Sequence, residues 1–206
     1  HIFYQISTIR AMHRGDLSLV FPVMRGLAPL LTAAVAYIAL SERLSGLELF
    51  GLVIATLSVI AFAIPQGAGA HLPKDRAALF WAGCTAIGIA LYNVADANGV
   101  RTAQNPFTYI VWLFLLDWIM VTLMMVTIRR GTVIETLRAR WRTGVVAGIL
   151  AVLSFGSLMY GFTLVPAAMM SALRETAVVF GALLGWKLLR EGFGPRRVIA
   201  ALIMAL

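Results

Sequence analysis

Apolar runs long enough to cross a bilayer recur along the chain. They cover residues 17–40, 47–65, 77–99, 106–128, 143–165 and 166–189. Each run is close to the ~20 residues that a helix needs to cross a hydrocarbon core about 30 Å thick. Backbone groups in lipid must be satisfied within helices or a closed barrel, and the sequence lacks the strict apolar/polar alternation of barrel strands. The runs therefore predict an all-α polytopic membrane protein.

The composition supports this class and disfavours catalysis. Hydrophobic residues make up 61% of the chain and charged residues 13%, outside the range of soluble domains. The single cysteine, Cys84, cannot form an intrachain disulfide, and the three histidines lie at run ends or in loops. No histidine lies in the middle of a run, and no two aspartates share a run at a useful spacing. We expect no enzyme activity, no metal and no cofactor.

The net charge of +8 comes mainly from basic residues in the loops between the apolar runs. Alternate loops hold thirteen basic residues, namely Arg10, Arg14, Lys74, Arg76, Arg129, Arg130, Arg138, Arg140, Arg142, Lys187, Arg190, Arg196 and Arg197. The other loops hold only Arg43 and Arg101. This bias predicts that the basic loops face the cytoplasm, and that RRGTVIETLRARWR (129–142) is a solvated loop beside anionic lipid. The expected partners are the lipid bilayer and a small-molecule substrate, with no nucleic acid. A homodimer is a further possibility that the sequence leaves open.

The chain repeats itself at an offset of 149 residues. The offset aligns residues 24–57 with 173–206 without a gap, and places Arg25 on Arg174 and Glu42 on Glu191. The run of Arg174 is the fifth apolar run after the run of Arg25. Because this number is odd, the second copy is inverted in the membrane, an arrangement typical of secondary transporters whose substrate site lies between the repeats. The second copy begins near Ala77, so the first begins upstream of His1. The chain is thus interpreted as a fragment lacking roughly two and a half helices of ten.

Two stretches resemble the EamA-type proteins of the drug/metabolite transporter superfamily. They are GDLSLVFPVMRGLAPLLTAAVAYIALSERLSGLELFGLVI (15–54) and SALRETAVVFGALLGWKLLREGFGPRRVIAALI (171–203), similar to the fourth-to-fifth and ninth-to-tenth helices of that family. In the family a helix ends at a Glu before a short turn and a Gly-bearing helix, as Glu42 and Gly51 do here. Members commonly have both ends in the cytoplasm, which would place the loop after Glu191 outside, whereas the charge bias places it inside.

The resemblance implies a ten-helix bundle of two inverted five-helix repeats around a central cavity, which moves small metabolites across a bacterial inner (plasma) membrane. Residues 1–65 would form the C-terminal part of the first repeat: the end of helix 3 and helices 4 and 5. Residues 77–206 would form the second repeat, helices 6 to 10, with the last one truncated.

Two arginines lie inside apolar runs. Arg25 and Arg174 are each the ninth residue of a run, about 13 Å from the start of the helix and so near the midplane. A central arginine facing lipid costs at least ~2.5 kcal/mol, so each should face the protein interior or water and imply a polar cavity. Each could bind a carboxylate or phosphate through bidentate bonds. Alternatively, Glu175, Asp96 or Asp117 neutralise the arginines in structural ion pairs.

The candidate substrate-binding residues are Arg25, Arg174, Glu175, Tyr92, Asn93 and Asp96. Tyr92, Asn93 and Asp96 share a helical face at spacings of three and four. Asp117 and Glu175 are candidates for proton coupling. Two alternatives remain: Asp96 could have a role at the helix end, and Asp117 could have a structural role. These patterns predict an alternating-access transporter of small anionic or zwitterionic metabolites. The alternative is a non-transporting membrane subunit or assembly factor with structurally paired charges.

Overall fold

The computed structural model describes residues 1–15, 17–63, 76–128 and 133–177. These residues form helices and short connections: α1 Ile2–Arg14, α2 Leu17–Leu40, α3 Gly46–Ala63, α4 Arg76–Thr102, α5 Pro106–Ile128, α6 Val133–Gly161 and α7 Ala167–Glu175. Within the described ranges there is no strand. The expectation of an all-helical chain is confirmed for them.

Four of the described helices are long and apolar enough to cross a membrane. The candidate spans are Val23–Leu40, Arg76–Thr102, Pro106–Thr127 and Arg138–Gly161, and α3 contributes a shorter apolar stretch, Gly46–Ser58. The expected runs 17–40 and 106–128 coincide with α2 and α5. The last run, 166–189, is covered by α7 at its start, and its remainder from residue 178 lies outside the described residues.

The prediction of a loop through residue 142 is wrong where the structure describes that segment. The helix α6 already begins at Val133 and carries Arg138, Arg140 and Arg142 of the supposed loop. Its backbone departs from helical geometry at Arg140, with φ −124° and ψ 20°, so the helix is kinked within this charged segment. Glu, Leu, Arg and Ala are good helix formers. A stretch rich in them can be helical without being apolar, and the search for apolar runs could not detect it.

The chain divides into two compact units. The first comprises residues 1–95 together with the chain from Val165, and the second comprises Asp96–Leu164. In the first unit α1 packs against α4: a Cβ on Gly88 would lie only 3.1 Å from the Cα of Tyr4. A side chain at this position would require the two helices to move apart by a few tenths of an ångström. A small core of Ala11, Val20, Met24, Ala78 and Ala82 joins α1, α2 and α4.

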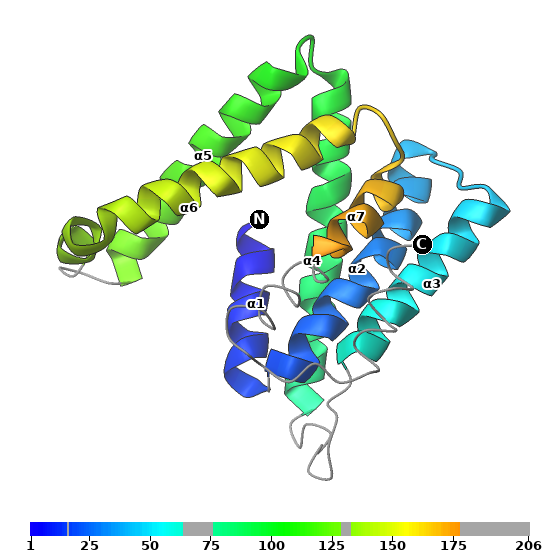
Figure 1. The fold of residues 1–206 in the computed structure, drawn as a ribbon, viewed down its shortest axis with the longest axis horizontal. Coiled ribbons are helices and arrows are strands. Elements are labelled where there is room, and N and C mark those ends of the chain that lie inside the picture. Colours follow the sequence, from blue (N-terminus) through cyan, green and yellow to red (C-terminus); the bar gives the residue numbers. More distant parts are fainter. Residues whose placement is uncertain (16, 64–75, 129–132, 178–206) are drawn as a thin grey trace. The chain divides into compact units, whose positions relative to one another are not determined.

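The helices α2 and α3 form a hairpin in the first unit, with α7 packed beside both of them (Figure 1). The helix α2 ends at Leu40, and the next residue, Ser41, has a φ of 55°, in the left-handed region that commonly terminates helices. Ser45 and Glu48 then cap the start of α3 through two hydrogen bonds, each from the backbone of one residue to the side chain of the other. The Ser45 N–H donates to Glu48 Oε2 (2.7 Å), and the Glu48 N–H donates to Ser45 Oγ (3.3 Å). This capping box fixes where α3 begins.

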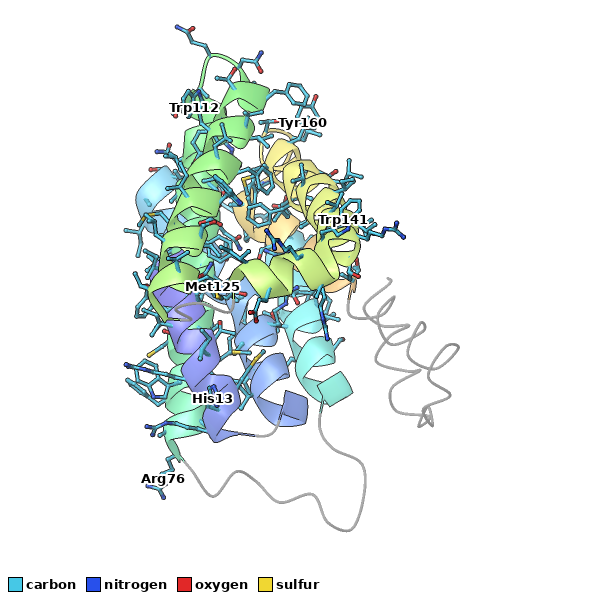
Figure 2. The ribbon with its side chains drawn as sticks, turned by 90° about the vertical axis from the view of Figure 1, so that its left-hand side faces the viewer. His13, Arg76, Trp112, Met125, Trp141 and Tyr160 are labelled. Atoms are coloured by element: carbon cyan, nitrogen blue, oxygen red, sulfur yellow. The ribbon has the colours of Figure 1, made fainter. Side chains whose placement is uncertain are left out.

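The second unit contains α5, α6 and the end of α4. Its helices meet largely through aromatic rings: Phe107 stacks on Tyr160, and Phe114 meets Phe155 edge-on. Much of the rest of both helices is exposed and apolar. Figure 2 shows Trp112 and Met125 along α5 and Trp141 and Tyr160 on α6, all of which are exposed. Large apolar faces of this kind suit a lipid environment.

Candidate functional site

An ion pair between α2 and α7 forms the centre of the candidate site. Arg25 Nε lies 3.2 Å from Glu175 Oε2, and the two side chains are 16% and 3% exposed. A buried glutamate needs such a partner because a lone buried carboxylate is costly. The structure therefore brings together two residues that the sequence had placed 150 positions apart. Glu175 is one of the acids considered as a counter-charge for the arginines.

Arg174 points to a different neighbour from Glu175. Its Nη1 donates to the Tyr92 hydroxyl on α4 at 2.9 Å. The Tyr92 ring is buried and meets the rings of Tyr4 and His1 edge-on, with centroids 5.4 and 5.0 Å apart. Successive residues of a helix point about 100° apart, so Arg174 can face α4 while Glu175 faces α2.

Asn93 bridges three helices. Its Nδ2 donates to Ser171 Oγ on α7 (3.1 Å) and to Thr32 Oγ1 on α2 (3.4 Å). All three side chains are buried, and the Thr32 hydroxyl donates in turn to the Ala28 carbonyl (2.8 Å). Thus α2, α4 and α7 share one polar node in addition to the ion pair.

Thr32 and Ser171 were not predicted as site residues. The available signal was their spacing: Thr32 lies seven residues after Arg25, and Ser171 four residues before Glu175. At these spacings each hydroxyl shares a helix face with the charged residue. The sequence does not say that the two faces meet.

Glu42 lies at the other end of the contact between α2 and α7. Its Oε2 accepts a hydrogen bond from the Ala167 N–H, the first residue of α7, at 2.9 Å. A carboxylate at this position satisfies an otherwise unpaired donor and complements the positive end of the helix dipole. Glu42, just after the end of α2, contacts the start of α7, whereas Arg25, earlier in α2, contacts the end of α7. The two helices therefore run antiparallel.

The charged side chains of this site form a partly buried cluster. It holds two guanidinium groups, those of Arg25 and Arg174, and one carboxylate, that of Glu175. Guanidinium groups are suited chemically to bind a carboxylate or phosphate.

Two predicted residues belong to the second unit. The Tyr109 hydroxyl donates to Asp96 Oδ1 on α4 (3.4 Å), and Asp96 is buried. Asp117 lies near the middle of α5 and is partly buried. In the same unit Arg101 Nε donates to the Phe162 carbonyl (2.6 Å), just past the C-terminus of α6. Among the described residues, no group of three or more His, Cys, Asp or Glu side chains is arranged to hold a metal ion.

A comparison with known protein families matches residues 76–206 to a family described as the EamA-like transporter family. The matched segment begins at the first residue of α4 and covers more than half of the chain. A search of the curated proteins finds no match.

Proposed function

Because the chain belongs to the EamA-like transporter family, we propose that it acts as a secondary transporter of small anionic or zwitterionic metabolites. Membership of this family and the four apolar helices support the assignment as an integral membrane transporter. The observation that supports an anionic substrate is the partly buried cluster on α2, α4 and α7, which holds two guanidinium groups and one carboxylate. Arg25 and Arg174 are assigned to the substrate carboxylate or phosphate, and Tyr92 and Asn93 to its remaining polar groups.

The proposed mechanism is alternating access between two inverted five-helix repeats of a ten-helix bundle. In this proposal α2 belongs to the first repeat (1–65), and α4 and α7 belong to the second (77–206). The offset of 149 residues that pairs Arg25 with Arg174 supports it. So does the ion pair between α2 and α7, because a site at the repeat interface requires charged residues from both repeats.

Several further assignments belong to this proposal. Asp96 is a candidate substrate contact, and Asp117 or Glu175 a candidate proton carrier. The inner membrane of a bacterium is the proposed location, with the basic ends of α1 and α6 on the cytoplasmic side. A second copy of the chain is a candidate partner within the bilayer.

One observation favours the alternative, a non-transporting membrane subunit. The Arg25–Glu175 contact is also what a purely structural ion pair would look like. The two functions differ in one measurable respect. A structural pair tolerates any replacement that keeps both charges, whereas a substrate site requires the planar guanidinium fork.

The test measures uptake and efflux by the intact protein in lipid vesicles, using amino acids, organic acids and phosphorylated metabolites. Arg25→Lys and Arg174→Lys keep the charge but remove the bidentate geometry, and Arg142→Lys changes an exposed arginine of α6 in the same way. We expect flux of one anionic class that falls at least tenfold in the first two variants and is unchanged in the third. If the wild-type protein moves none of these compounds, the transporter proposal fails and the structural subunit is favoured.

A further inference from the structure

The Glu175 carboxylate occupies the position where an anionic ligand would meet Arg25. It comes from α7, is 3% exposed and lies 3.2 Å from the guanidinium nitrogen of the facing helix. The contact is an ion pair between two helices, α2 and α7. A free carboxylate, which is not attached to a helix, can align both oxygens with the guanidinium edge.

We propose that Glu175 is an internal substitute for the substrate anion, which displaces it from Arg25 while Glu175 takes up one proton. This inference rests on the proposed transport function. The proton comes from water on the side where the substrate binds, forms an O–H bond on the Glu175 carboxylate, and leaves with the substrate on the other side. The bond changes are limited to this proton transfer. One monoanion and one proton cross together, so transport is electroneutral.

The charges of the cluster support the exchange. Without substrate, the Glu175 carboxylate is paired with the Arg25 guanidinium. If the substrate carboxylate replaced Glu175 and Glu175 stayed ionised, a buried carboxylate would lose its cation, which is costly. Protonation of Glu175 removes that cost. A neutral carboxylic acid is also a hydrogen-bond donor, which an ionised one is not.

Among the ionisable groups around Glu175, the carboxylate itself is the group assigned to take up the proton. Arg25 on α2 and Arg174 on α7 are its charged neighbours. From α4 comes Tyr92, which is bonded to Arg174, and from α1 Tyr4 and the adjacent His1, whose rings contact Tyr92. The ionisable residue of α3 is Glu48, exposed at its first turn and bonded to Ser45. Arg and Tyr ordinarily change charge only well above pH 7, and His1 meets Tyr92 rather than Glu175.

The sign of the pH dependence follows from linkage. Binding takes up a proton, so affinity for the anion falls as pH rises, by up to about tenfold per pH unit for one proton. At pH values low enough that Glu175 is already protonated before binding, the affinity becomes independent of pH.

The experiment uses the intact protein with succinate, glutamate and inorganic phosphate as probes. A pH-sensitive dye in weak buffer reports proton uptake on binding, and the same dye inside vesicles reports proton flux. For the wild type we expect about one proton taken up per anion bound. In Glu175→Gln we expect no proton uptake, affinity at least tenfold higher at pH 8, and no dependence of binding on pH. The control Glu135→Gln, an exposed carboxylate of α6, should behave as wild type.

The outcomes separate this inference from the proposed function. Transport of an anion by the wild type without proton uptake overturns the inference and leaves the function standing. The same holds if binding to Glu175→Gln keeps the wild-type pH dependence. If the wild type neither binds nor transports any of the three probes or the wider panel, both fail. The wild-type proton measurement needs no variant, so poor folding of Glu175→Gln would not prevent the test.

Discussion

The helices α2 and α5 have almost the same length and are both strongly apolar, yet they are built into their units differently. In the first unit, 33% of the apolar span of α2 is buried; in the second, only 6% of that of α5 is. The buried face of α2 carries small and polar residues such as Ala28, Thr32 and Ala36, whereas α5 exposes large ones such as Trp112 and Trp118. Small residues let membrane helices approach, and polar ones bond across them. Side-chain size and polarity, rather than hydropathy, distinguish the site helix.

The largest effect is expected from removing one partner of the ion pair in the first unit. Arg25→Ala leaves Glu175 buried without its cation and should lower the free energy of unfolding by about 3–5 kcal/mol. The double variant Arg25→Met/Glu175→Gln removes both charges and should recover most of that loss. Thermal unfolding in detergent measures both.

Arg142→Ala is the matched control for this experiment, because Arg142 is exposed on α6 in the second unit. It should leave the unfolding midpoint almost unchanged. If Arg25→Ala proved equally harmless, the charged cluster would contribute no more to stability than a surface residue. The contrast between the two units would then rest on apolar packing alone.

Sequence reasoning succeeds where a single helix determines the answer. The bounds of α2 and α5 follow from the lengths of their apolar runs, because the bilayer sets that length. It fails for the start of α6, because residues 133–142 are helical but charged. The pairing of Arg25 with Glu175 could be considered in advance because the apolar runs contain so few acids.

The polar node around Asn93 could not be predicted in the same way. Hydroxyls in apolar helices often bond to the preceding turn, as Thr85 does to the Trp81 carbonyl. Thr32 also bonds to its own helix, through Ala28, yet it accepts from Asn93 as well. Which hydroxyl also meets a neighbouring helix depends on the rotation of each helix about its axis. Packing between the helices sets that rotation, and the sequence pattern of a single helix does not predict it.

A smaller effect is expected from close packing in the second unit. A Cβ on Gly99 would overlap the Tyr109 ring, whereas a Cβ on Gly144 would meet nothing within 4 Å. Gly99→Ala should therefore lower the free energy of unfolding by about 1–3 kcal/mol through overpacking. Gly144→Ala should be neutral or slightly stabilising, because alanine favours the helix. The unfolding midpoints of the two variants measure the difference.

The double variant Gly99→Ala/Tyr109→Ser shows whether the Tyr109 ring causes the loss of stability in Gly99→Ala. The shorter side chain frees the space, so the loss in the double variant should be smaller than the sum of the losses in the two single variants. If instead Gly99→Ala and Gly144→Ala were equally neutral, α4 and α5 would not be closely packed at Gly99. The aromatic contacts that characterise the second unit would then tolerate extra volume.

The smallest effect concerns the polar bridge of the first unit. Asn93→Ala removes the bonds from α4 to Thr32 on α2 and to Ser171 on α7. Interhelical hydrogen bonds in membrane proteins contribute about 0.6 kcal/mol on average and rarely more than about 1.7 kcal/mol. We expect a loss of about 1 kcal/mol in the free energy of unfolding, measured by thermal unfolding of the protein in detergent.

Thr85→Val is the control on the same helix. Thr85 is buried like Asn93, but its hydroxyl donates to the Trp81 carbonyl one turn back, with no bond to a second helix among the residues that the structure describes. Loss of the Thr85 hydroxyl in this variant should change the free energy of unfolding by less than about 0.5 kcal/mol. If the two variants were equally stable, the bonds across helices would add nothing to those within one helix. The burial of Asn93, Thr32 and Ser171 would then be explained better by a role in binding than by a role in holding α2, α4 and α7 together.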